Sequence, residues 1–214
     1  MKVTLMRHTA EPEMLAGWAA AMCYNGKNPA RSLKVAMDGG HESVLEHVTF
    51  TFEIEGVSRV LLAQLTRHRL ASYSVQSQRY CGANLDLVVP DSMVRPELVD
   101  DIIEAKKAVE KLYKKATKLG VPDEDARYFT FQAGQTKLVM TMNARELRHF
   151  FALRCCTRAQ WEIRHMARQM LALCQDVAPA IFADAGPGCV RGNCPEGEKS
   201  CRRKDNAKAE NART

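Results

Sequence analysis

The chain has 214 residues, with 31 Lys or Arg against 25 Asp or Glu, which gives a formal net charge of +6. Its hydrophobic fraction of 46% excludes a wholly disordered chain, and no apolar run approaches the roughly 20 residues of a membrane-spanning helix. The first residues, MKVTLMRHTAEPEM, contain no apolar signal segment. We therefore expect a cytoplasmic protein with no membrane partner, in which the eight cysteines are thiols.

Hydrophobic periodicity predicts the secondary structure in chain order. We expect a strand at residues 2–6, helices at 12–22 and 29–37, a strand at 48–55, a short helix from Val57 into Arg67, a polar loop to about Tyr80, a long helix at 95–119, a strand at 134–142, a helix opened by Asn143 and a last long helix at about 159–182. This order predicts an α+β fold with a small, mostly antiparallel sheet and several long helices.

Two local signals support these boundaries. Phe50, Phe52 and Ile54 alternate with polar residues, which is typical of a half-buried strand. Asn143, followed three residues later by Glu146, resembles a capping box at the start of a helix.

The composition changes near residue 186, so we expect a single domain at residues 1–186 and a tail at 187–214. The tail is rich in Gly, Pro and polar residues, holds seven Lys or Arg against four acids, and shows no apolar period. We expect it to be flexible and poorly ordered. Its cysteines, Cys189, Cys194 and Cys201, form no CxxC pair, so we expect no metal site.

Several polar or charged residues are predicted to lie on apolar helix faces. The stripe of the helix before Arg67 continues to Gln64, Arg67 and His68, and Arg154 lies on the apolar side of the helix opened by Asn143. An inward guanidinium needs a counter-charge, because an unpaired buried charge is very costly. An internal carboxylate or an external anionic ligand could supply it. Because the neighbouring segments contain few acids, the ligand is the better account.

Residues 67–80, RHRLASYSVQSQRY, combine three arginines and one histidine with hydroxyl and amide side chains. By composition alone, this segment could bind any phosphate. Its order is more specific, because RHR is followed after seven residues by Ser77 and then by Arg79. The string resembles the RHR-x7-S signature of the flavin-dependent thymidylate synthases. Further segments that resemble that family are GHESVLEH at 40–47, NARELRHFFALR at 143–154 and AQWEIR at 159–164.

The resemblance implies conversion of dUMP to dTMP, with FAD as cofactor and with 5,10-methylenetetrahydrofolate and NADPH as co-substrates. It also implies a homotetramer with sites at the subunit interfaces, in which residues 75–79 come from a different subunit from Gln64 and Arg67. The residues implied to bind dUMP are Gln64, Arg67, Gln76, Ser77, Arg79, Arg127 and Arg154. Those implied to contact FAD are His41, Ser43, Arg67, His68, Arg69, Asn143, Arg145 and His149.

Arg154 and Ser77 are the candidate catalytic residues. Arg154 would stabilise negative charge that develops on the O2/N3 edge of the uracil, which activates the ring without a covalent bond to the enzyme. We expect Ser77 to position the substrate, because no Asp/His pair in the local sequence would activate it as a nucleophile. Three of the implied FAD contacts have simpler explanations: His41 as a helix cap, Asn143 as an N-cap, and His149 as a surface or core residue.

The alternative function is that of a basic nucleic-acid-binding protein, in which residues 67–79 and the tail bind phosphates. This alternative explains the charge, but not the His41 and Asn143 segments or the inward Arg154. Aromatic residues are only 7% of the chain and do not cluster as a platform for stacking bases. A zinc-dependent regulator built on the tail cysteines is the weakest hypothesis. We therefore expect small-molecule substrates and no nucleic-acid partner.

Overall fold

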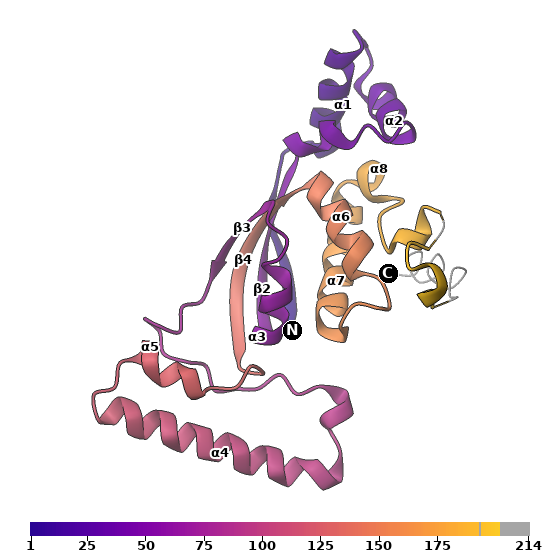
Figure 1. Ribbon diagram of the computed structural model, residues 1–214. Coiled ribbons are helices and arrows are strands. Elements are labelled where there is room, and N and C mark those ends of the chain that lie inside the picture. Colours follow the sequence, from indigo (N-terminus) through magenta and orange to yellow (C-terminus); the bar gives the residue numbers. More distant parts are fainter. Residues whose placement is uncertain (193, 202–214) are drawn as a thin grey trace. The chain divides into compact units, whose positions relative to one another are not determined.

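The structure, a computed structural model, describes residues 1–192 and 194–201 and confirms an α+β fold (Figure 1). The strands are β1 (Lys2–His8), β2 (Thr49–Ser58), β3 (Ala71–Val75) and β4 (Gln135–Asn143), and they form one sheet in the order β1-β2-β4-β3. The backbone N–H of Arg59 donates to Gly134 O, and that of Ala144 donates to Val48 O, so β2 and β4 run antiparallel. The expectation of a small, mostly antiparallel sheet is confirmed.

Helices connect these strands and follow the last of them. The α-helices are α1 (Pro12–Cys23), α2 (Pro29–Asp38), α3 (Arg59–Leu65), α4 (Pro96–Lys118), α5 (Asp123–Ala126), α6 (Ala144–Arg154), α7 (Trp161–Val177) and α8 (Pro179–Phe182). The 3₁₀ helices are η1 (Glu42–His47), η2 (Asp91–Met93), η3 (Arg127–Phe129), η4 (Gly188–Val190) and η5 (Gly197–Lys199). None of the helices in the described part of the chain combines the length and apolar character needed to cross a membrane.

Strand β3 lies where the sequence predicts a polar loop. Ala71, Tyr73 and Val75 alternate with two serines, and the first set is half-buried while the serines are exposed. This is the period of a strand, but the polar composition of the segment concealed it. The prediction of a loop is therefore wrong for these five residues.

The predicted last helix is interrupted. Helix α7 ends at Val177, and the short helix α8 begins at Pro179 after Ala178, whose φ and ψ are −141° and 65°. Proline has no N–H for the helical hydrogen bond and disfavours helical geometry in the residue before it. The expectation of one helix through Phe182 is wrong for this reason.

The chain divides into two compact units, and every strand contributes residues to both. The first unit contains Met1–Lys2, Ile54–Arg67 and Ser74–Leu138. Helix α3 begins in it at a cap, because Ser58 Oγ accepts a hydrogen bond from the backbone N–H of Leu61 at 3.0 Å. Helix α4 has no buried residue, so its apolar stripe stays partly exposed in the single chain.

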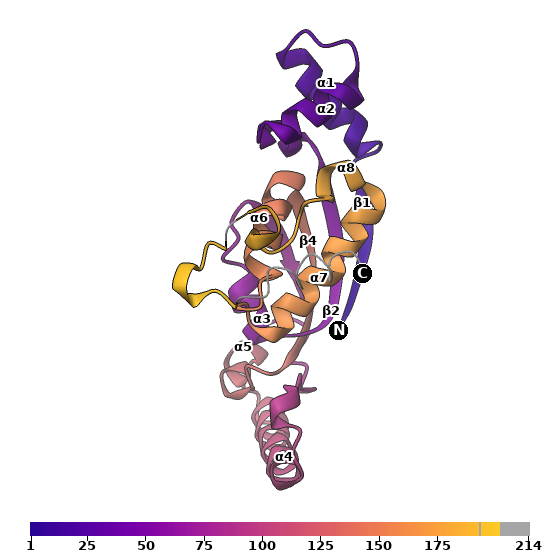
Figure 2. The same ribbon diagram turned by 90° about the vertical axis from the view of Figure 1, so that its right-hand side faces the viewer.

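The second unit contains Val3–Glu53, His68–Tyr73 and the chain from Val139 onward. In this unit α6 and α7 cover one face of the sheet, as Figures 1 and 2 show. Helices α1 and α2 pack closely, because a Cβ atom at Gly17 would lie only 2.5 Å from Pro29 O. Glycine is therefore needed at that contact.

Aromatic rings connect the sheet to the helices of the second unit. The ring of Phe50 on β2 lies 5.4 Å from that of Phe182, which lies 6.0 Å from that of Phe151. Phe151 lies 5.7 Å from Phe150, and Phe150 lies 4.9 Å from the imidazole of His68. All four contacts are edge-to-face, a favourable geometry for aromatic pairs. We call these five residues the ring row, and it ends at the central residue of the RHR motif.

Candidate active site

The second unit contains a polar cavity of about 510 Å³, a volume typical of small-molecule sites. Its walls come from η1, the residue after the RHR motif, the first turns of α6 and the segment after α8. The lining residues are Glu42, Glu46, Leu70, Asn143, Arg145, Glu146, His149 and Arg191. The cavity therefore brings together three residues that the sequence predicts as FAD contacts, namely Asn143, Arg145 and His149.

Asn143 fixes the start of α6. Its Oδ1 accepts a hydrogen bond from the backbone N–H of Glu146 at 2.8 Å, so the predicted N-cap is confirmed. Arg145 and His149 are four residues apart, lie on one face of the helix and are exposed. The cap therefore orients the helix face that presents both side chains to the cavity.

Two cavity arginines each have a carboxylate partner on η1. Arg145 Nη1 lies 2.5 Å from Glu46 Oε1, and Arg191 Nη1 lies 3.1 Å from Glu42 Oε1. The Arg145 pair is about half exposed, and such pairs contribute at most about 1 kcal/mol. An anionic ligand could therefore replace Glu46 as the partner of Arg145 at little cost.

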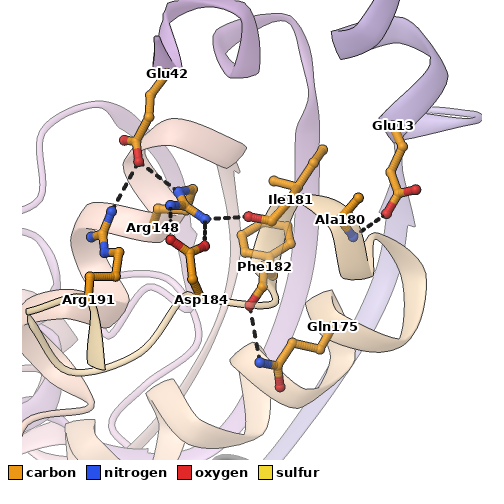
Figure 3. Close-up of polar contacts among 9 residues, drawn as sticks. All are labelled: Glu13, Glu42, Arg148, Gln175, Ala180, Ile181, Phe182, Asp184 and Arg191. Atoms are coloured by element: carbon orange, nitrogen blue, oxygen red, sulfur yellow. Dashed lines mark hydrogen bonds and ion pairs between the residues drawn. The ribbon is translucent and has the colours of Figure 1, made fainter. Parts of the chain in front are cut away.

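Glu42 also belongs to a network around the buried Arg148 (Figure 3). Arg148 Nε donates to Glu42 Oε1 at 2.9 Å, and its two Nη atoms donate to the carboxylate of Asp184 at 2.6 and 3.0 Å. Nη1 also donates to Ile181 O. Burial lowers the pKa of Arg148, but the two carboxylates raise it more, so the side chain stays charged. Arg148 is a structural residue that connects α6 to η1 and to the chain after α8.

His68 is buried between Glu146 and Arg154. Its Nδ1 lies 3.2 Å from Glu146 Oε1, and Arg154 Nε donates to its Nε2 at 3.0 Å. Burial lowers the pKa of His68 below its ordinary value, with the hydrogen bond to Glu146 opposing this effect and the charge of Arg154 adding to it. Since the ordinary value is 6.5, His68 is neutral at pH 7. Burial also lowers the pKa of Arg154.

The other residues of the predicted FAD site lie near the cavity residues in the chain, but they do not line the cavity. His41 and Ser43 flank the cavity residue Glu42 and are exposed, and Arg69 is exposed beside the cavity residue Leu70. His41 precedes η1, but its side chain makes no capping hydrogen bond, so the alternative role as a cap is wrong.

Arg67 belongs to the first unit and is exposed. Helix α3 ends at Leu65, so the helical spacing that predicts an inward Arg67 does not reach it. The expectation that Arg67 faces the core or a cavity is therefore wrong in the single chain, whereas the same expectation for His68 is confirmed by its 6% exposure.

Two predicted dUMP residues of the first unit meet at Glu124. Arg79 Nε forms an ion pair with the Glu124 carboxylate, and Arg127 Nε donates to Glu124 O at 3.1 Å. Arg59 lies near Arg127, and its pKa is lowered first by burial and then by the positive charge of Arg127. These three guanidiniums form a basic cluster suited to a phosphate.

Gln64, Gln76 and Ser77, which are also predicted to bind dUMP, form hydrogen bonds within this unit. Gln64 Nε2 lies 3.4 Å from Val60 O, and Ser77 Oγ accepts from the backbone N–H of Arg79 at 3.1 Å. The backbone N–H of Gln76 donates to Lys137 O on β4. Gln78 lies between Ser77 and Arg79 in the chain, and its buried amide nitrogen has no hydrogen-bond partner among the described residues. An orphaned donor of this kind is costly unless a ligand or water satisfies it.

Sequence reasoning missed several residues of these clusters. Glu42 and Glu46 are four residues apart in the GHESVLEH segment, and this spacing could have identified them as a pair on one side. Arg59 and Glu124 carry no specific signal in the sequence. Arg191 lies in the segment that was expected to be poorly ordered, and no local pattern pointed to it.

None of the cysteines in the described part of the chain is joined in a disulfide. Cys155 is buried, and burial raises the pKa of its thiol to about 12, so it fills core space. Among residues 1–192 and 194–201, His, Cys, Asp and Glu side chains form no group of three suited to a metal ion. The described part of the tail forms η4 and η5. Residues 193 and 202–214 lie outside the described residues, and the flexibility of the tail stays a prediction.

Comparison with known proteins identifies the family. The family model described as thymidylate synthase complementing protein matches residues 4–180. A flavin-dependent thymidylate synthase of Geobacter sulfurreducens is 48% identical over 217 residues, which cover 94% of each chain. A flavin-dependent thymidylate synthase of Clostridium tetani is 42% identical over 233 residues, which cover 94% of this chain and 93% of the relative.

Solved structures share the fold. ThyX from Helicobacter pylori, complexed with FAD and dUMP, superposes with a TM-score of 0.70 at 24% identity and covers 87% of this chain and 100% of that one. The UMP/dUMP methylase PolB from Streptomyces cacaoi, bound with 5-Br dUMP, superposes with a TM-score of 0.73 at 23% identity. The match covers 85% of this chain and 93% of PolB. The family model and the close relatives show that this chain belongs to the flavin-dependent thymidylate synthases, as its RHR-x7-S motif predicts.

Proposed function

We propose that the chain catalyses the reductive methylation of dUMP to dTMP, with FAD as cofactor, 5,10-methylenetetrahydrofolate as one-carbon donor and NADPH as reductant. The names of its relatives support the reaction, and the ThyX structure with FAD and dUMP has the same fold. The observation in this chain that carries the proposal is the cavity at the start of α6, because it collects Asn143, Arg145 and His149.

The donor set of this cavity fits FAD. Arg145 and Arg191 offer guanidinium groups, and Asn143 and His149 offer an amide and an imidazole beside the N-terminus of α6, where anions are favoured. FAD would supply the redox chemistry when bound. The further residues proposed to contact it are His41, Ser43, Arg67, His68 and Arg69.

The cluster around Glu124 fits the phosphate of dUMP. Arg79 and Arg127 are already oriented by Glu124. A phosphate would replace the Glu124 carboxylate as the partner of Arg79 and carries a higher charge. The orphaned amide of Gln78 gives a further donor in the same unit. Gln64, Arg67, Gln76 and Ser77 complete the proposed set, with Ser77 as a positioning hydroxyl.

Arg154 is proposed to act on the uracil ring. Its guanidinium would stabilise negative charge that develops on the O2/N3 edge, so that the ring reacts without a covalent bond to the protein. Its half-buried position supports this role, because a charge acts more strongly where water is partly excluded.

Substitution of Arg154 tests the proposal. We expect Arg154→Ala to abolish dTMP formation while FAD stays bound, measured by product analysis and flavin absorbance. Arg31→Ala, which removes an exposed charge from α2, is the control and should keep full turnover. Near-normal turnover of Arg154→Ala would contradict the assigned role. Wild-type protein that binds no FAD would contradict the proposed function itself.

The proposed enzyme is a homotetramer with its sites at subunit interfaces. The exposed apolar residues of α4 support association, with Val99, Ile103 and Leu112 between 38% and 48% exposed. Light scattering coupled to size exclusion measures the assembly, and we expect Leu112→Lys to reduce its mass.

Binding of single-stranded DNA measured against salt tests the rival function of nucleic-acid binding, and we expect no binding at physiological salt. The cytoplasmic location stays a prediction.

A further inference from the structure

His68 connects Glu146 to Arg154 through its two ring nitrogens. Nδ1 lies 3.2 Å from Glu146 Oε1, and Nε2 accepts from Arg154 Nε at 3.0 Å. Glu146 lies in the first turn of α6 and Arg154 is the last residue of the same helix. Both ends of this three-residue chain therefore belong to one rigid element, and the imidazole joins them.

These two contacts determine which tautomer His68 adopts. A guanidinium nitrogen can only donate, so Nε2 of His68 must be the acceptor in the contact with Arg154. The proton of the neutral ring then lies on Nδ1, which donates to the Glu146 carboxylate. With the proton on Nε2 instead, two N–H groups would face each other and the contact with Arg154 would be lost.

The surroundings of His68 hold the ring in place. His68 and Glu146 are 6% and 8% exposed, and the ring of Phe150 packs edge-to-face on the imidazole at 4.9 Å. The hydroxyl of Tyr73 on β3 donates to the backbone carbonyl of His68 at 2.9 Å. His149, 6.3 Å away between ring centroids, completes the titratable groups that face the imidazole. The orientation of the ring is therefore fixed by packing, while its tautomer is set by Glu146 and Arg154 together.

Two of the three arginines of α6, Arg148 and Arg154, are held in different ways. Arg148 is 2% exposed and donates directly to the carboxylates of Glu42 and Asp184, which balance its charge. Arg154 donates to the neutral ring of His68, so this contact orients the guanidinium without cancelling its charge. The contact with His68 therefore fixes the direction of the Arg154 guanidinium.

We infer that Glu146 is a positioning residue, which acts through His68 to hold Arg154 in the orientation that the reaction on the uracil ring requires. The inference rests on the proposed role of Arg154. A carboxylate behind a histidine fixes the tautomer and the direction of the ring. Without the carboxylate, both tautomers become accessible, and the hydrogen bond between Arg154 and His68 is lost for part of the time.

Kinetics of two Glu146 variants test the inference. We expect Glu146→Ala to bind FAD but to lower kcat for dTMP formation by about 10- to 100-fold, because small misplacements of a reacting group cost up to about 100-fold, with little change in KM for dUMP. Glu146→Gln keeps an acceptor oxygen for Nδ1 and should recover most of the lost rate. Wild-type kcat in Glu146→Ala, or equal losses in the two variants, would overturn the inference.

The tautomer gives a readout that does not depend on activity. With ¹⁵N-labelled histidine, the ring nitrogens of His68, assigned by the loss of their signals in His68→Asn, should show a protonated Nδ1 in the wild type. In Glu146→Ala we expect signals of both tautomers. A wild-type ring protonated on Nε2 would overturn the inference even if dTMP is formed. If the tautomers behave as expected but no dTMP is made, the proposed function fails instead.

Glu162 provides a matched control for the loss of a buried carboxylate. It lies on α7 and is 1% exposed. We expect Glu162→Gln to change the thermal midpoint without changing the His68 nitrogen signals. If Glu162→Gln lowers kcat and alters the His68 signals as Glu146→Ala does, general destabilisation explains both variants and the positioning role is wrong.

Discussion

The guanidinium of Arg148 is bound side by side to the carboxylate of Asp184, with Nη1–Oδ1 and Nη2–Oδ2 distances of 2.6 and 3.0 Å. Such paired hydrogen bonds between charged groups are among the strongest in proteins. The arginine is buried, while the Asp184 side chain is about half exposed. Loss of the pair would therefore leave the buried Arg148 without its main counter-charge, whereas the carboxylate of Asp184 would stay in contact with water.

Replacement of Arg148 should destabilise the fold. We expect Arg148→Met to lower the free energy of unfolding by about 3 kcal/mol, because it removes the main counter-charge of Asp184 and leaves Glu42 with Arg191 alone. Urea unfolding at one fixed protein concentration measures this loss. Arg145→Met is the matched control on the same helix, and its exposed pair with Glu46 should cost at most about 1 kcal/mol. Similar losses in both variants would contradict the structural role of Arg148.

Asp184 should make stability depend on acidic pH. Burial raises its pKa, but the hydrogen bond and the charge of Arg148 lower it more, so the folded pKa lies below the ordinary 3.8. A carboxyl with a lowered folded pKa stabilises the fold above its unfolded pKa, and this stability is lost as pH falls through the folded pKa. Below about pH 4, thermal midpoints should fall more steeply for the wild type than for Asp184→Asn. Parallel curves would show that the pair does not lower this pKa.

Asn143 is both a helix cap and a proposed FAD contact, and two variants separate these roles. Asn143→Ala should cost about 1 kcal/mol of stability and weaken FAD binding. Asn143→Ser keeps an oxygen for the Glu146 N–H but loses the amide donor, so stability should recover while FAD affinity stays low. Thermal unfolding without FAD and a fluorescence titration with FAD measure the two effects. Recovery of both by serine would leave Asn143 with a capping role alone.

Arg191 tests whether the segment after residue 186 contributes to the cavity. We expect Arg191→Ala to weaken FAD binding by about 10-fold, the effect of one charge-assisted hydrogen bond of about 1.4 kcal/mol. Lys199→Ala removes a charge from the same segment but at a different cavity, and should not change the affinity. An unchanged affinity in Arg191→Ala would show that Arg191 only neutralises Glu42.

The parts of the fold that could be predicted are those that depend on neighbouring residues. Val48, Phe50, Phe52 and Ile54 are all 0% exposed, as their alternation predicts. The cap of α6 was predictable for the same reason, because the two groups that form it lie three residues apart. A period or a cap is complete within one element, so no knowledge of the tertiary structure is needed.

The partners of the buried charges could not be predicted. The argument that few acids lie nearby favours an external ligand, but it fails for Arg148, whose carboxylates lie 36 and 106 residues away. Arg154 likewise finds His68 across 86 residues. Contacts of this kind arise from strand order and helix packing, which periodicity does not specify. The RHR-x7-S motif identified the family, but not how its histidine is oriented.

The network in Figure 3 also indicates what a chain shortened near residue 182 would lose. Ala180 N donates to Glu13 Oε1, Gln175 Nε2 donates to Phe182 O, and the ring row is complete at the same residue. Truncation after Phe182 would therefore keep every aromatic contact and yet remove the main counter-ion of Arg148. A chain that ends two residues further, at Asp184, would contain this counter-ion again. A chain shortened to Phe182 would thus lose the paired hydrogen bonds that hold Arg148, together with the buried Ala185.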